Sequence, residues 1–266
     1  MASSSSIVSA DKVGIEEFNR LLAQYPTLIQ RISDEKGVKN GQKTLKELDE
    51  VRYNEALNDF NSDKRTRPMT LEDIKILVEW KLRHGKFRPT LMKLVSSNDP
   101  ADAQDIIKEA FEIYDKKTDI GATLDVLTRL RGIGPATASL LLAVHDASRV
   151  IFFADEAFWW LCCDGKQSPI KYNAKEYRTL CSEVDKLRNR LGVGASDVEK
   201  VAYVLMKQPG QPEQSHDVAH VKNEKENTSS TASSKKRKVN AKETNTKVNN
   251  ITQEQPSLRR SKRVKS

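Results

Sequence analysis

Residues 130–142 read LRGIGPATASLLL, a stretch that predicts a tight turn leading directly into a helix. Gly132 and Gly134 lack a Cβ, so the turn can adopt positive φ and a ligand can approach its backbone closely. Pro135 suits the first helical position, where its missing N–H costs nothing, and the amides beside it are left without helical partners. Free amides at the positive end of a helix attract anions, so we expect a phosphate to bind here.

Leucines at helical spacing precede this turn, so residues 120–147 are expected to form a helix, a hairpin and a second helix. Other helices carry start signals, such as the capping-box spacing of Thr70 and Asp73. Residues 150–154 are β-prone but short, and we expect a buried connector there rather than a sheet. We therefore predict an all-α fold. The expected helices cover residues 14–32, 44–60, 70–84, 89–95, 100–114, 120–130, 135–147, 155–164, 174–191 and 195–206.

The distribution of charge separates a body from a tail. Residues 207–266 hold 14 Lys and Arg against 6 Asp and Glu, whereas the residues before them hold 31 of each class. The tail also has almost no large apolar residues, so we expect it to be disordered. The predicted organisation is a flexible N-terminus at 1–11, an all-helical body at 12–206 and a disordered basic tail at 207–266.

The tail contains the dense basic stretch SSKKRKV at residues 233–239. Its uninterrupted run of cations resembles a nuclear localisation signal, which fits the acidic grooves of nuclear import receptors. The run consists of Lys235, Lys236, Arg237 and Lys238. We therefore expect a nuclear protein with an import receptor as one partner, the alternative being a merely solvated linker. Because the body is neutral overall, binding of nucleic acid requires a local basic patch.

Several classes of protein are disfavoured by the composition. No apolar run approaches the roughly 20 residues that span a bilayer, and the start of the chain lacks a signal-peptide pattern. Cys162, Cys163 and Cys181 favour reduced thiols and are too few for a four-cysteine metal site. We expect no membrane association, no metal and no cofactor, and the oligomeric state stays open.

A carboxylate follows the hairpin at a suggestive distance. Asp155 lies 21 residues after Gly134 and opens the helical segment DEAFWWLCC. The segment LRGIGPATASLLLAVHDASRVIFFADEAF, residues 130–158, resembles the helix–hairpin–helix plus aspartate signature of the HhH-GPD superfamily of DNA glycosylases. The resemblance implies a glycosylase-like helical body that binds duplex DNA and rotates a nucleotide out of the stack, with the carboxylate facing its sugar.

The resemblance gives Asp155 the catalytic role. An ionised carboxylate stabilises the developing oxocarbenium ion and activates water, so the implied reaction is hydrolysis of an N-glycosidic bond. In bifunctional members a lysine near the start of the hairpin's second helix forms a Schiff base, and the aligned position here is Ala136. The resemblance therefore implies a monofunctional glycosylase without lysine-dependent lyase activity. The alternative for Asp155 is a purely structural helix cap.

Two further sets of residues are expected to contact DNA. Candidate contacts to the DNA backbone are Arg131, Gly132, Gly134, Ala136 and Thr137 at the hairpin, and Lys81, Arg83, Lys86 and Arg88 in the basic segment KLRHGKFRP. Trp159 and Trp160 are candidates for a base-stacking pocket, although both could instead pack in the core. The same sequence is compatible with two alternatives to an enzyme. One is a noncatalytic nucleic-acid binder that kept the fold, and the other is a nuclear scaffold whose hairpin is only a tight turn.

Overall fold

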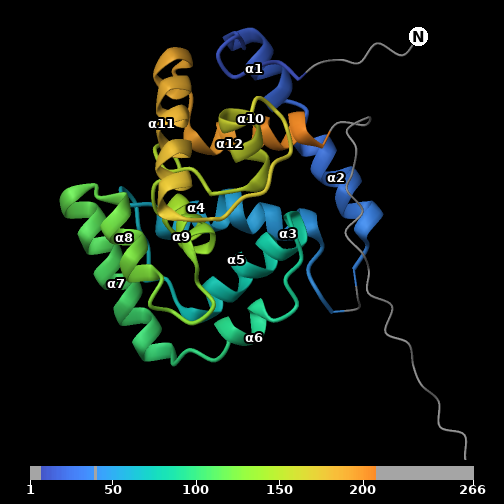
Figure 1. Ribbon diagram of the computed structural model, residues 1–266. Coiled ribbons are helices and arrows are strands. Elements are labelled where there is room, and N and C mark those ends of the chain that lie inside the picture. Colours follow the sequence, from blue (N-terminus) through green and yellow to red (C-terminus); the bar gives the residue numbers. More distant parts are fainter. Residues whose placement is uncertain (1–6, 39–40, 208–266) are drawn as a thin grey trace, which may run out of the picture. The chain divides into compact units, whose positions relative to one another are not determined.

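The computed structural model describes residues 7–38 and 41–207, and every regular element in that part of the chain is helical (Figure 1). The expected all-α body is confirmed. The helices are α1 (Ile15–Leu22), α2 (Tyr25–Lys36), α3 (Leu45–Glu50), the π-helical turn η1 (Val51–Glu55), α4 (Ala56–Phe60), α5 (Leu71–His84), α6 (Leu91–Val95), α7 (Pro100–Lys117), α8 (Ile120–Leu127), α9 (Pro135–His145), α10 (Asp155–Cys162), α11 (Ala174–Leu191) and α12 (Ala195–Met206).

Some predictions concern residues outside the described part. The basic run Lys235–Lys238 lies outside it, as does the tail beyond Lys207. Within residues 7–38 and 41–207, no helix combines the length and apolar character needed to cross a bilayer.

The first expected helix, residues 14–32, is divided into α1 and α2, so the prediction of one helix is wrong there. Pro26 explains the break. It has no N–H to donate to the carbonyl of Leu22, and its ring clashes with a continuing helix at that point. By contrast, α11 and α12 have the predicted bounds, and the capping box of α5 is present, with the Thr70 amide donating to Asp73 Oδ2 at 2.8 Å.

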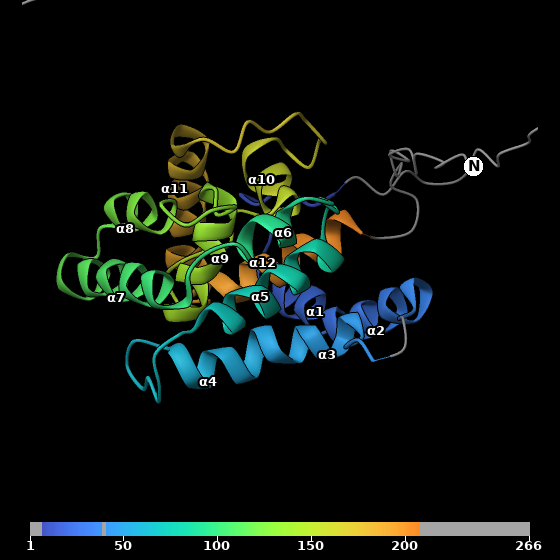
Figure 2. The same ribbon diagram turned by 90° about the horizontal axis from the view of Figure 1, so that it is seen from below.

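Helix α9 forms the centre of the body. Every residue from Ala136 to His145 is buried, which suits a helix that is apolar on all sides. It packs against α4, α5 and α8, and Figure 2 shows it enclosed by other helices. Because the rest of α9 is packed on all sides, the start of this helix at Pro135 is held in a fixed position.

A buried connector, residues 150–154, joins this central helix to α10, as the sequence predicts. The amide of Phe153 donates to Ser139 Oγ of α9 at 2.9 Å, and the hydroxyl of Tyr177 on α11 donates to the carbonyl of Ile151 at 2.8 Å. These bonds fix the start of α10, and with it Asp155, relative to α9.

Residues 7–11, expected to belong to a flexible N-terminus, contact the body. The indole N–H of Trp160 donates to the carbonyl of Val8 at 2.9 Å, and the guanidinium of Arg190 donates to the carbonyl of Ala10 at 2.5 Å. The side chain of Ile7 lies directly against Gly165. This segment thus covers part of α10 and α11.

Candidate functional site

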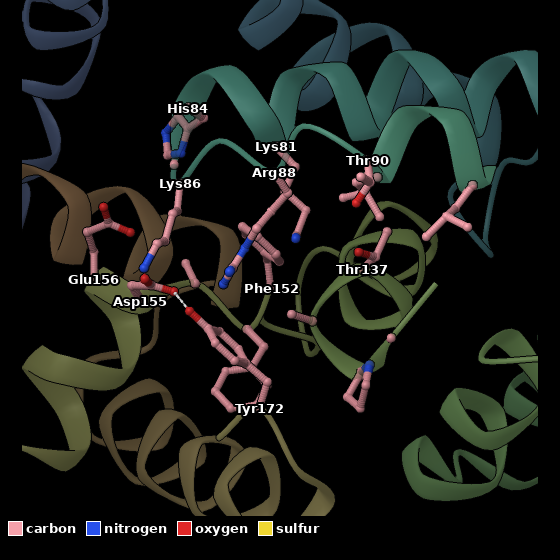
Figure 3. A pocket seen from close by; sticks show the side chains of 18 residues that line it. Lys81, His84, Lys86, Arg88, Thr90, Thr137, Phe152, Asp155, Glu156 and Tyr172 are labelled. Carbon is pink, nitrogen blue, oxygen red and sulfur yellow. Dashed lines mark hydrogen bonds between the residues drawn. The ribbon is translucent and has the colours of Figure 1, made fainter. Parts of the chain in front are cut away.

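A cavity of about 350 Å³ lies where the hairpin, the end of α5 and the start of α10 meet (Figure 3). Its wall also includes the loop that follows α5, the first residues of α6, the buried connector and Tyr172 from the loop before α11. Segments far apart in the sequence therefore converge on one space, and most of the predicted site residues can be located relative to it.

The first half of the hairpin is bound by the neighbouring helix α6. Gly132 has φ of +82°, and a Cβ there would lie 2.9 Å from Leu94 Cβ and 3.1 Å from the amide nitrogen of Val95. The amide of Arg131 donates to Asn98 Oδ1 at 2.8 Å, and Asn98 Nδ2 donates back to the Arg131 carbonyl at 3.0 Å. Glycine at position 132 is thus required by the protein's own packing.

The second half of the hairpin faces the cavity. Gly134 caps α9 without any side-chain hydrogen bond, and a Cβ at this position would meet nothing within 4 Å. Among the described residues, no protein acceptor bonds the amide of Gly134 or Ala136, while the Thr137 amide bonds the Gly134 carbonyl at 2.9 Å. Gly134, Ala136 and Thr137 all line the cavity. The start of α9 therefore combines unpaired amide donors with residues that border an open space, and this is the combination that an anion site requires.

Asp155 also lines this cavity and is partly exposed. It is the first residue of α10, whose N-cap is Ala154, and its carboxylate makes no capping hydrogen bond. Instead Asp155 Oδ1 accepts a hydrogen bond from the Tyr172 hydroxyl at 2.6 Å. The alternative in which Asp155 serves only as a helix cap is therefore not what the structure shows.

Tyr172 is a residue of this site that no feature of the sequence predicts. Its φ of +53° places a bulky residue in the left-handed region, which costs energy and is concentrated at functional sites. Burial, and then the negative charge of Asp155, raise the pKa of the Tyr172 hydroxyl, so it stays protonated and donates. It lies in the loop before α11, where no motif marks it.

Three of the four predicted cations of the basic segment line the cavity. Lys86 and Arg88 are exposed, whereas Lys81 on α5 is partly buried. Arg83 is the exception, because its guanidinium donates to the carbonyls of Gly37 and Lys43 instead. The prediction of a DNA contact at Arg83 is corrected accordingly: its side chain holds a loop of the body.

The predicted base pocket at Trp159 and Trp160 also requires correction. The side chain of Trp160 is buried, and the indole N–H of Trp159 donates to the carbonyl of Ser168 at 2.8 Å. Neither indole lines the cavity, whose aromatic wall consists of Phe152, Phe153 and Tyr172. Periodicity alone could not separate two adjacent tryptophans that pack inward from two that face a ligand.

Two remaining charges lie close to the hairpin and Asp155. Arg131 is exposed at the turn but does not line the cavity. Glu156 does line it and is buried. Burial raises the pKa of its carboxyl, and Lys207 Nζ lies 3.4 Å from Glu156 Oε1.

In the described part of the chain, no group of three His, Cys, Asp or Glu side chains could hold a metal ion.

Comparison with known proteins found no match: no family model, no curated protein and no solved structure matches the chain. The interpretation of the cavity therefore depends on its own residues and on their geometry.

Proposed function

We propose that this protein binds duplex DNA through the hairpin and hydrolyses the N-glycosidic bond of a nucleotide rotated into the cavity. The observation that carries the proposal is the composition of one cavity. It combines unpaired amides at the start of α9, the cations Lys81, Lys86 and Arg88, and the carboxylate of Asp155.

The amides and cations account for binding of the backbone. A phosphate placed beside Gly134 would accept hydrogen bonds from the amides of Gly134 and Ala136, with the positive end of the α9 dipole behind them. Lys86 and Arg88 at the exposed rim supply the local positive charge that a neutral body needs. Gly134 suits this contact because no side chain stands between its backbone and the cavity.

The carboxylate accounts for the chemistry. Asp155 on the cavity wall would face the anomeric carbon, stabilise positive charge as the base departs and orient an attacking water. The Tyr172 hydroxyl holds one carboxylate oxygen at 2.6 Å and leaves the other for this role. Phe152 and Phe153 provide an apolar wall for a base, within a cavity near the lower end of the roughly 300–1,000 Å³ typical of ligand sites.

The test is release of free base by the purified full-length protein from duplexes containing alkylated, deaminated or oxidised bases. We expect release by the wild type and a rate reduced about 100-fold or more by Asp155→Asn. Asp125→Asn, at an exposed position on α8 away from the cavity, is the matched control and should keep the full rate.

The other outcomes select between the alternatives. DNA binding without base release, or release that Asp155→Asn leaves unchanged, would contradict the enzymatic proposal. Salt-sensitive binding alone would favour a noncatalytic DNA binder, and absence of any binding would favour a scaffold.

The proposed location is the nucleus. It is supported by the basic run Lys235–Lys238 in the sequence, which fits the acidic groove of an import receptor. Replacing the four cations by alanine in a fluorescently tagged chain should move the protein out of the nucleus, and unchanged nuclear accumulation would contradict the assignment.

A further inference from the structure

In the proposed hydrolysis Lys81 contributes positive charge but takes no part in the chemical step. It lies in the last turn of α5, and its side chain points into the cavity (Figure 3). Its Nζ makes no hydrogen bond or ion pair with any residue of the described part of the chain. The cavity therefore contains a primary amine that the protein itself leaves free for a ligand.

The surroundings of this amine increase its reactivity. Burial lowers the pKa of Lys81, the charge of Asp155 opposes this shift, and the nearby charge of Arg88 makes a smaller contribution that lowers the pKa. Partial desolvation and a neighbouring cation are two of the ways in which proteins convert lysine into a nucleophile, because both increase the fraction of neutral amine. The same cavity wall provides both.

We propose that Lys81 is an amine nucleophile that attacks a carbonyl carbon in this cavity, and that the carbonyl is the aldehyde of an abasic deoxyribose in DNA. The inference rests on the proposed function, since a DNA phosphate at Gly134 would hold the sugar within the cavity. The resemblance to glycosylases implies no amine nucleophile, because position 136 is alanine. Lys81 supplies the amine from a different helix, which the sequence could not place beside the hairpin.

The reaction balances without an added oxidant or reductant. The neutral Nζ bonds to C1′ of the open-chain sugar, and the aldehyde oxygen leaves as water to give an imine. Loss of the C2′ proton to a base, for which Asp155 lines the same cavity, breaks the C3′–O bond and releases the DNA strand with its phosphate. Water then hydrolyses the imine, returning the lysine amine and an unsaturated sugar aldehyde.

The experiment uses the full-length protein, a duplex with one preformed abasic site and sodium borohydride, which reduces an imine to a stable amine. We expect a covalent protein–DNA complex on a denaturing gel, with mass spectrometry placing the sugar remnant on Lys81. Lys81→Arg preserves the charge but cannot form the imine, so the trapped complex should fall by at least about 20-fold. Fluorescence anisotropy on the same duplex would show whether Lys81→Arg still binds DNA.

A matched control is Lys108→Arg, because Lys108 is an exposed lysine on α7 that does not line the cavity. It should trap as well as the wild type. The inference is overturned if the wild type forms no complex, if Lys81→Arg traps normally, or if the sugar remnant maps to another amine. Since the abasic site is preformed, a failure to release bases from damaged duplexes would contradict the proposed glycosylase and leave this readout intact.

Discussion

The body contains two Gly-x-Gly turns, GIG at residues 132–134 and GVG at residues 192–194, that share one backbone design. The first glycine of each turn has positive φ, +82° at Gly132 and +71° at Gly192. The second glycine of each turn caps a helix, α9 or α12, without a side-chain hydrogen bond. By local geometry alone, the starts of α9 and α12 are equivalent.

Their surroundings differ. At the start of α12, the amides of Ala195 and Ser196 donate to the carbonyls of Ser148 and Ala147 at 2.9 and 3.0 Å. At the start of α9, the amides of Gly134 and Ala136 have no acceptor among the described residues, and both residues line the cavity. A glycine turn therefore fixes the shape of a helix start, while the neighbouring chain decides whether that start is structural or free for a ligand.

The largest effect is expected from Gly134→Asp. Aspartate is a favourable N-cap, so its carboxylate should take over the free amides and repel phosphate. We expect DNA affinity to fall about 100-fold or more, with a free energy of unfolding that is unchanged or higher. Fluorescence anisotropy and thermal unfolding would measure the two effects.

Two controls accompany this change. Gly134→Asn has the same shape without the charge and should weaken binding less, and Gly194→Asn at the second turn should leave DNA affinity unchanged. Full DNA affinity in Gly134→Asp would mean that the start of α9 does not bind phosphate.

The first glycines of the two turns should differ in stability when each is replaced by alanine. Both replacements carry the cost of a positive φ, roughly 1 kcal/mol. Gly132→Ala also forces a Cβ against Leu94 and Val95, which adds about 2 kcal/mol. A Cβ at position 192 would meet nothing within 4 Å, so Gly192→Ala carries the conformational cost alone. Urea unfolding would measure both variants, and equal losses would refute the close contact between the hairpin and α6.

A smaller effect is expected at the start of α10, where the Asp155 carboxylate accepts a hydrogen bond from Tyr172 instead of capping the helix. Tyr172→Phe removes the hydroxyl and leaves the carboxylate less well oriented. Because a hydrogen bond to a charged group contributes about 1.5–3 kcal/mol, we expect base release to slow roughly 10-fold at unchanged DNA affinity. Single-turnover kinetics would measure the rate, and a full rate would show that the tyrosine does not position the carboxylate.

The smallest effects are expected at the rim of the cavity. Lys86→Gln and Arg88→Gln should each reduce the slope of log affinity against log salt by about 1, because each removes one phosphate contact. Arg83→Gln is the contrasting change, since that guanidinium binds the carbonyls of Gly37 and Lys43. Arg83→Gln should lower the stability of the body and leave the salt slope unaltered. A reduced slope would show that Arg83 does contact DNA.

Much of the fold could be predicted from the sequence because its signals are local. Caps, glycine turns and helical periodicity predict α5, α11 and α12, and the apolar run at 150–154 predicts the buried connector. The helix predicted at residues 14–32 was too long, because Pro26 interrupts it despite the helical spacing of its apolar residues.

The site was predictable only in part, because burial and side-chain partners depend on contacts between distant segments. The hairpin and Asp155 do line one cavity, yet the tryptophans pack elsewhere. The bond between Tyr172 and Asp155, and the entry of Lys81 into the cavity, arise from tertiary contacts that no motif encodes. The same limit explains why the sequence could not separate the start of α9 from that of α12.

The most direct test is an NMR titration of the ¹⁵N-labelled full-length chain with a short duplex that contains a stable abasic-site analogue. We expect the amide signals of Gly134 and Ala136 to shift on binding, while those of Ala195 and Ser196 stay unchanged because protein carbonyls already occupy them. DNA binding that leaves Gly134 and Ala136 unshifted would contradict the assignment of the start of α9 as the phosphate site.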